Sequence, residues 1–226
     1  MDEADTQDND VRGWTLDHDQ FRGVLADLIE QVRALRADDA DAAEALSRWW
    51  RSFSGAVRHH FRAEDEGIWP TLTRHAPGIG PTLEDLSAQH RRIESELSGV
   101  DRRFDALPTV VTTAGLAADR ADLLVALTQV QAAILDHLAL EEREAVPVLA
   151  TRVPPPECRR IERNMVKGLS LREVADLLPR ILAFADDAER ATMLARLPPP
   201  VRLLNRLLFT PRYHRTRATL PLGKRT

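Results

Sequence analysis

Two stretches of the sequence place a glutamate one helical turn after a histidine. The stretches are HHFRAEDEGIWP at residues 59–70 and DHLALEEREAVP at residues 136–147, which align without gaps. The alignment pairs His60 with His137 and Glu64 with Glu141. Side chains four residues apart on a helix project from one face, roughly 5–6 Å apart at Cβ. One carboxylate from each stretch can then bridge two metal ions, while the imidazoles bind from the outside.

Two further histidines, His18 and His90, lie on apolar helical stripes in the segments that precede these stretches. A buried carboxylate without a partner is costly, so such groups are normally paired or bound to a metal. Imidazole together with carboxylate suits iron better than calcium or magnesium, which prefer all-oxygen sites. The candidate metal ligands are His18, His60, Glu64, His90, His137 and Glu141.

The elements that must position these ligands are four long helices. Four segments repeat apolar residues in steps of three and four, which is typical of the buried face of a helix. The linkers expected around residues 37–39, 76–80 and 108–113 are short, so neighbouring helices should be antiparallel. The sequence therefore predicts an all-α fold with an up-down-up-down four-helix bundle at residues 14–152. In that topology the four histidines lie at one end of the bundle. Pro81 suits a helix start, and Thr112 or Thr113 is a candidate cap of the fourth helix.

The two ends of the chain have a different character from the bundle. Residues 1–13 are acidic and are expected to be disordered. Residues 153–226 are expected to form a helical C-terminal extension with a basic tail. The helices expected in the extension are 156–167, 171–185 with Ser170 and Glu173 as a capping box, 187–196 and 200–209, before an irregular end of fifteen residues. The segment 201–209 should dock its apolar face, with Val201, Leu204, Leu207 and Leu208, on the bundle or on a second copy rather than on a membrane.

Composition narrows the class of protein. The net charge is −4 and the chain has one cysteine, Cys158. A disulfide within the chain and a cysteine-based metal cluster are therefore excluded, and nucleic acid is not an expected partner. The polar, acidic start is unlike a signal peptide, and no apolar run reaches the roughly 18 residues of a membrane span. The expected location is the cytoplasm.

With its four histidines and two H-x-x-x-E-[DE] elements, each followed by a proline, the chain resembles the hemerythrin family, the HHE cation-binding domain. The resemblance implies a non-heme di-iron centre in which His18 and His60 serve one iron, His90 and His137 serve the other, and Glu64 and Glu141 bridge. Oxygen-carrying hemerythrins have H-x-x-x-H in the third helix, whereas this sequence has His90-x-x-x-Glu94. The ferritin-like alternative needs E-x-x-H and a long crossover, and neither is found.

Several charged residues near the site have open roles. Glu94 is one turn from His90 but just off the apolar stripe, so it is a candidate ligand or a neighbour of the ligands. His59 is expected to support the site from outside or to lie at the surface. Asp65, Glu66, Glu142 and Glu144 are expected to form a solvated face.

Three functions fit these features. The first is a protein that binds or senses dioxygen, nitric oxide, peroxide or iron and passes the signal through residues 155–226. The second is a di-iron enzyme that turns over peroxide or nitric oxide, and the third is metal storage or a structural metal. Apart from a small ligand, the expected partners are a second copy of the chain or another protein at the C-terminal region.

Overall fold

The computed structural model describes residues 8–111, 116–166 and 169–223, and within these ranges it contains helices and no strand. Four long helices dominate, and the predicted all-α class is confirmed. They are α1 (Arg12–Ala34), α2 (Ala40–Ala63), α4 (Gly80–Val110) and α5 (Leu116–Arg152). A π-helical turn, η1 (Glu64–Ile68), continues α2 into the short α3 (Trp69–His75), and a 3-10 turn, η2 (Pro77–Ile79), leads into α4.

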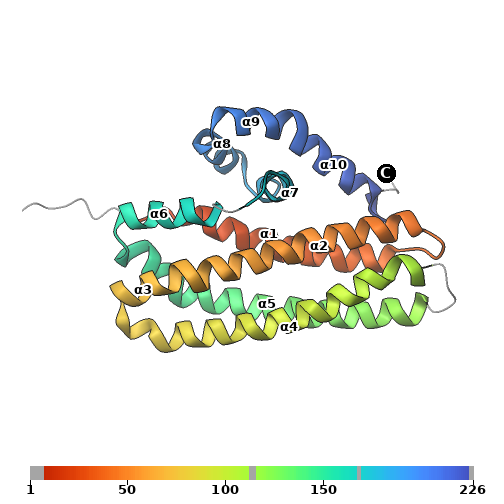
Figure 1. Cartoon of the computed structure of the whole chain (residues 1–226), viewed down its shortest axis with the longest axis horizontal. Helices are drawn as coiled ribbons and strands as arrows, with labels where there is room; N and C mark the ends of the chain where they lie inside the picture. Colours follow the sequence, from red (N-terminus) through yellow and green to blue (C-terminus); the bar gives the residue numbers. More distant parts are fainter. Residues whose placement is uncertain (1–7, 112–115, 167–168, 224–226) are drawn as a thin grey trace, which may run out of the picture.

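The long helices form an antiparallel bundle. In Figure 1, α1 and α2 lie above α4 and α5, and the chain reverses at the ends of the bundle. Contacts connect α1 with α2, α2 with α4, α4 with α5, and α5 with α1, which closes a ring of four. The predicted up-down-up-down order is therefore confirmed.

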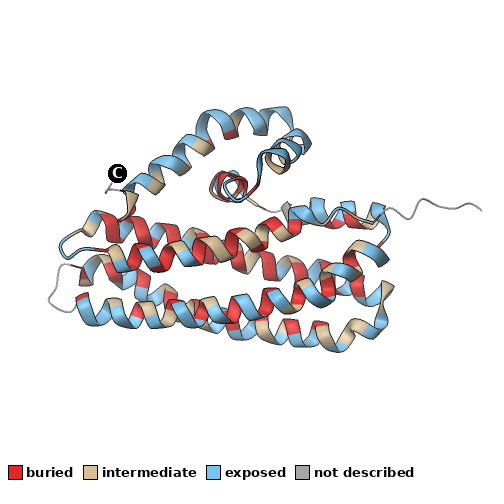
Figure 2. Ribbon diagram, turned by 180° about the vertical axis from the view of Figure 1, so that it is seen from behind, coloured by how far each residue is buried: buried red, intermediate tan, exposed pale blue. Residues whose placement is uncertain are grey.

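The core follows the apolar stripes. Figure 2 shows the buried residues along the inward faces of the long helices. Phe21, Trp50 and Phe53 are at most 1% exposed. The ring of Trp50 stacks on that of Phe104 with centroids 5.1 Å apart. The main apolar cluster includes Phe21 and Phe61 and extends along the bundle to Phe104 and Leu107.

The helix α1 begins at Arg12, two residues before the expected start of the bundle. The Asp10 carboxylate accepts a hydrogen bond from the Arg12 backbone N–H at 3.0 Å. The Asn9 side-chain amide donates to the carbonyls of Leu149 and Val153 at 2.9 and 2.7 Å. The end of the acidic segment is thus bound to α5, while residues 1–7 are outside the described residues.

Helix α4 extends through Pro108 to Val110, although a linker was expected from residue 108. A proline inside a helix lacks the N–H that would bond the carbonyl four residues earlier, here that of Phe104. The Ser47 hydroxyl of α2 donates to the Phe104 carbonyl at 2.6 Å and replaces the missing partner. The candidate caps Thr112 and Thr113 lie outside the described residues.

The C-terminal region forms five further helical elements and a second π-helical turn. They are α6 (Pro155–Val166), α7 (Leu171–Leu182), α8 (Asp187–Arg196), α9 (Pro199–Leu204), η3 (Asn205–Phe209) and α10 (Thr210–Thr219). The capping box predicted for Ser170 and Glu173 is confirmed at the start of α7. The prediction of an irregular end is wrong for residues 212–219, because α10 continues directly from η3 with Pro211 in its first turn, where proline is tolerated.

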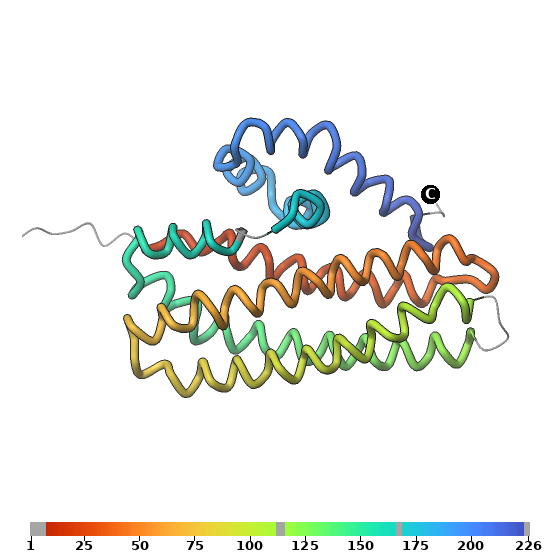
Figure 3. The backbone as a smooth tube through the Cα atoms, viewed as in Figure 1, coloured from red at the N-terminus to blue at the C-terminus, as the bar shows by residue number. Residues whose placement is uncertain are grey.

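This region packs on the α1–α2 side of the bundle. Figure 3 shows α7 end-on above the horizontal bundle helices, with α10 returning towards the turn between α1 and α2. The Tyr213 ring lies 5.7 Å from the Trp49 ring, the Arg217 guanidinium pairs with Asp27, and Leu220 is fully buried. The basic tail therefore meets α1 and α2 of its own chain.

The apolar face of residues 201–209 is rotated relative to the prediction. Val201 and Leu204 pack with the buried Phe209 in a small cluster on α7, whereas Leu207 and Leu208 are exposed. The prediction assumed an α-helix throughout, but Asn205–Phe209 is a π-helical turn, which advances less per residue. The face in contact therefore changes within this segment.

By length and composition α5 could cross a membrane. In this structure it is a wall of the bundle, with contacts to α1 and α4. It also carries the buried His137 and Glu141, as expected of the core helix of a bundle rather than of a lipid-facing span.

Candidate metal centre

The six candidate ligands come together inside one end of the bundle. His18 lies in the second turn of α1, His60 in the last turn of α2 and His90 in α4. His137 and Glu141 lie one turn apart in α5, and Glu64 begins the π-helical turn η1, an element frequent at functional sites. None of the six is more than 3% exposed.

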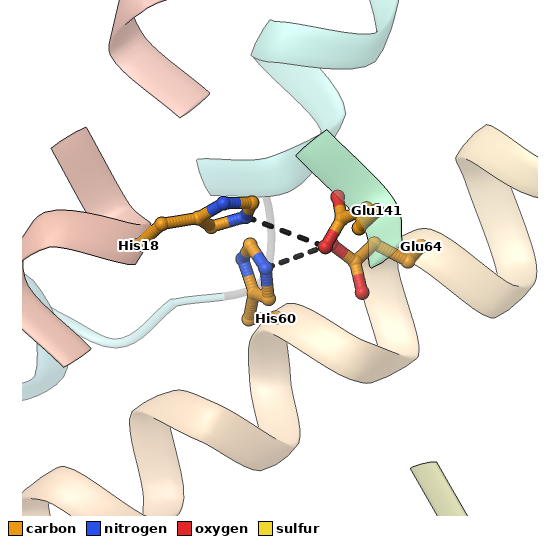
Figure 4. Close-up of side chains that lie close together, drawn as sticks. All are labelled: His18, His60, Glu64 and Glu141. Carbon is orange, nitrogen blue, oxygen red and sulfur yellow. Dashed lines mark ion pairs between the residues drawn. The ribbon is translucent and has the colours of Figure 1, made fainter. Parts of the chain in front are cut away.

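The donor atoms form two groups that share Glu64. One group is His18, His60, Glu64 and Glu141, and the other is Glu64, His90 and His137. Within each group the donor atoms lie within 4.8 Å of one another. Figure 4 shows the His18 and His60 rings facing the Glu64 and Glu141 carboxylates.

Each carboxylate lies between histidines of both groups. Glu64 Oε1 is 2.7 Å from His60 Nε2, and Glu64 Oε2 is 3.2 Å from His90 Nε2. Glu141 Oε2 is 3.4 Å from His18 Nε2 and 3.6 Å from His137 Nε2. All four histidines thus direct Nε2 inwards, towards two carboxylates that face both pairs.

Several of these buried atoms are close together yet form no hydrogen bond. His60 Nε2, both Glu64 oxygens and Glu141 Oε2 have no partner of hydrogen-bond geometry among the described residues. Polar atoms so deeply buried normally have a partner. Nitrogen and carboxylate donors that converge without bonding one another fit a bound cation, so the residues present suit the metal that the sequence predicts.

The other ring nitrogen of each histidine faces a carboxylate or an amide. His18 Nδ1 is 2.8 Å from Glu142 and His90 Nδ1 is 3.0 Å from Asp65. His60 Nδ1 lies 3.4 Å from Asp17, and His137 Nδ1 lies 3.1 Å from Gln89. At His18, His90 and His137 these contacts are hydrogen bonds that orient the imidazole and favour an N–H on Nδ1, which leaves Nε2 to face a metal. His60 Nδ1 has no hydrogen-bond partner among the described residues, and His18 Nε2 also accepts from the Trp14 indole N–H at 3.0 Å.

The imidazoles of this cluster differ in their electrostatics. Burial opposes the charged form of His60, but the charges of Glu64 and Asp17 outweigh it and hold the pKa of His60 well above its ordinary value. Burial lowers the pKa of His137 to about 3 and also lowers the pKa of His18. Burial, together with the Glu64 charge, holds the pKa of Glu141 well above its ordinary value. Burial likewise opposes ionisation of Glu64, but His60 and His90 outweigh it and lower the pKa of Glu64. The two carboxylates therefore differ in their proton affinity.

Aromatic side chains enclose the cluster. The Phe61 ring stacks on His90 with centroids 4.1 Å apart, and the Phe21 ring meets His60 edge-on at 5.1 Å. The Trp14 indole N–H donates to Glu141 Oε1 at 2.9 Å. The surroundings are therefore apolar, apart from the few groups that hold the ligands in place.

Glu94, a candidate ligand in the sequence, lies outside the cluster in the structure. Its carboxylate pairs with Arg58 at 2.7 Å, and its side chain is 48% exposed. The apolar stripe of α4 passes through the buried Ile93, and the next residue is about 100° further round the helix. His59 also points away, and its ring N–H donates to the Met165 carbonyl at 2.6 Å.

The expected solvated face contains residues that contact the ligands. Asp65 and Glu142 directly follow the two glutamates in the aligned stretches, and each faces a histidine of the other half of the bundle. Asp17 and Gln89, which directly precede His18 and His90, were missed. The signal available in the sequence was that each of these residues directly precedes the first histidine of its half of the bundle.

Comparison with known proteins agrees with this geometry. The model of the hemerythrin HHE cation-binding domain matches residues 9–149. The chain is also 26% identical, over 168 residues, to the zinc finger protein BRUTUS of Arabidopsis thaliana. That match covers 73% of this chain but only 13% of the relative's length. No solved structure matches. The family match spans all six converging ligands, and the chain therefore belongs to the hemerythrin HHE cation-binding domain family.

Proposed function

We propose that the cluster holds two iron ions that share Glu64 and Glu141. The observation that carries this proposal is the overlap of the two donor groups at Glu64. A single ion would need only one of the groups. In the proposed centre His18 and His60 bind one ion, and His90 and His137 bind the other.

The centre is proposed to bind or sense a small molecule. A carboxylate-bridged pair of iron ions, when bound, supplies reversible binding of dioxygen, nitric oxide or peroxide. With both glutamates shared, each ion has two histidines and two carboxylates as its protein donors. A metal site that the protein does not close completely leaves a position for an external ligand.

The enclosure of the site supports a small ligand over a store of exchangeable metal. All six donors are buried, and aromatic rings stack directly on the histidines. A larger substrate would have to displace Phe61 or Trp14, whose indole N–H holds Glu141. The cytoplasm remains the proposed location, and the exposed Leu203, Leu207 and Leu208 remain the proposed place for a second copy or another protein.

The test is an anaerobic absorption experiment on the reduced, iron-loaded protein. Dioxygen, nitric oxide and hydrogen peroxide are added separately, and Glu94→Gln serves as a matched control outside the cluster. We expect a stable spectral change with at least one of the three that reverses when the ligand is removed. Continuous consumption of the added molecule would instead support an enzyme. A spectrum that responds to none of them would support storage or a structural metal.

A further inference from the structure

A cavity of about 290 Å³ lies between α2 and α7, outside the metal centre. Four arginines and a histidine line it: Arg48, Arg51, Arg172, Arg180 and His59. Its acidic lining residues are Glu173 and Asp176. A second cavity of about 100 Å³ lies beside it, shares Arg48 and Arg172, and adds Arg212. The junction between the bundle and the C-terminal region is thus rich in guanidinium groups.

Arg180 is the residue that most requires an explanation. It is 1% exposed, and its one side-chain hydrogen bond to a described residue, from Nη1 to the Ser52 hydroxyl, is long at 3.4 Å. Nε and Nη2 are buried and have no partner among the described residues. Burial lowers the pKa of Arg180 to about 10, so the side chain stays charged at neutral pH. A buried charge without a bonded partner is costly to the fold.

The acidic residues of the cavity are engaged elsewhere. Asp176 pairs with Arg212 at 3.2 Å, and Glu173 accepts a hydrogen bond from the Ser170 backbone N–H at 2.7 Å. Arg172 is exposed and forms no ion pair with a described residue. Arg48 and Arg51 pair with Glu44 and Asp105, which do not line the cavity, so the positive charge left unbalanced is that of Arg172 and Arg180.

A purely structural role for Arg180 explains only part of this arrangement. Its guanidinium carbon lies 5.9 Å from the centre of the Trp49 ring, and the charges of Asp17 and Asp176 act on it. These interactions moderate the cost of burial but leave Nε and Nη2 unbonded. They also do not account for a cavity next to the charge.

We propose that this cavity binds a phosphate group, either as inorganic phosphate or carried by a small metabolite. The planar guanidinium fork matches the oxygens of a phosphate and bonds them in pairs. Arg180 and Arg172 both line the cavity, the first buried and the second exposed, and they are the two groups assigned to the anion. The volume accepts a phosphate with a small organic remainder, because pockets for larger ligands typically have about 300–1,000 Å³.

Titration calorimetry on the full-length, iron-loaded protein tests the proposal. Inorganic phosphate and glycerol 3-phosphate are titrated separately at constant ionic strength. We expect saturable binding of at least one of them, and tighter binding of the ester would identify a metabolite as the ligand. Arg180→Met and Arg172→Gln should each weaken binding about tenfold or more, the equivalent of one charge-assisted hydrogen bond. Arg172→Gln changes an exposed residue, so it remains informative if Arg180→Met fails to fold.

The matched control is Arg143→Gln, which removes an equally charged but exposed side chain on α5. This variant should bind within about twofold of wild type, because screened surface charges contribute little. The iron absorption spectrum is recorded during each titration and should not change, which separates this cavity from the metal centre. Absence of saturable binding, or equal weakening in all three variants, would overturn the proposal.

Discussion

At the scale of single residues, the metal centre depends on both nitrogens of every histidine. Nε2 faces the interior of the cluster, and Nδ1 faces Asp17, Asp65, Gln89 or Glu142. The arrangement repeats in the two halves of the bundle, as do the ligands. The two halves therefore present similar sets of donors to the interior of the cluster.

Glu142 should affect metal affinity although it is not a proposed ligand. The hydrogen bond from His18, with Arg22 nearby, lowers the pKa of Glu142 to about 2, so it is a carboxylate at neutral pH. We expect Glu142→Gln to weaken iron binding by about 10–100-fold, the usual effect of losing such a contact. Competition with a chelator measures this, and Glu94→Gln is the control. Equal affinity in both variants would show that the His18–Glu142 contact does not support the site.

The metal-free protein should lose stability in mild acid. The pKa of His137 is about 3 in the folded chain, against an ordinary value near 6.5. The unfolded chain then binds more protons than the folded chain between these values, so the stability from His137 is present above about pH 6.5 and is lost as pH falls towards 3. Urea unfolding at pH 7, 6 and 5 should show a smaller loss for His137→Gln than for wild type. An identical loss in both would contradict the burial of a neutral His137.

Sequence reasoning proposed all six converging residues, because histidine and glutamate are unusual on an apolar stripe and helix periodicity places them on the inner face. The sequence left open whether Glu94 is a ligand, because a side chain at the edge of an apolar stripe can face either the core or the solvent. The neighbouring cation Arg58 determined the outcome. The contacts of Asp65 and Glu142 were missed because charged residues on outer faces are usually solvated.

At the scale of helices, the periodic patterns predicted the elements but not their irregularities. The periodic pattern shows neither of the two π-helical turns, nor the contact from Ser47 of α2 that accompanies the passage of α4 through Pro108. The C-terminal α10 was missed because Trp49 and Asp27 of the bundle, rather than an apolar stripe of its own, hold it in place.

Ser47 should stabilise the bundle by bonding the carbonyl that Pro108 of another helix leaves without an N–H donor. Ser47→Ala leaves the buried Phe104 carbonyl without its side-chain partner, while Pro108 supplies no N–H. We expect a loss of about 1–3 kcal/mol in the free energy of unfolding, the cost of an unsatisfied buried group. Denaturant unfolding measures the loss. Thr128→Ala is the control, because Thr128 bonds only a carbonyl of its own helix at the surface. A similar small effect in both would contradict the proposed role.

At the scale of the whole molecule, the C-terminal region and the bundle share a core. Leu220 is fully buried in the main apolar cluster, and the Leu222 N–H donates to the Gln31 side chain at 2.8 Å. After α8 and α9, the chain returns through α10 to α1 and α2 (Figure 1). Every proposed metal ligand precedes this region in the sequence.

Truncation after residue 197 should therefore lower thermal stability and leave the metal centre in place. Burial of Leu220 alone contributes about 2 kcal/mol, and the Tyr213 and Arg217 contacts are lost with it. We expect a lower Tm with an unchanged iron spectrum, measured by calorimetry and absorption. Binding of the full-length protein, but not the truncated one, to anionic vesicles would instead favour a membrane surface as the partner of this region.

The most direct test of the metal centre is to count the ions in each chain by native mass spectrometry after iron-replete expression. The shared donor groups predict two iron ions per chain in wild type and in Glu94→Gln. Glu64→Ala removes the carboxylate common to both groups and should leave fewer than two. Wild-type chains with one ion or none, or Glu64→Ala chains that keep both, would contradict a two-iron centre bridged by Glu64.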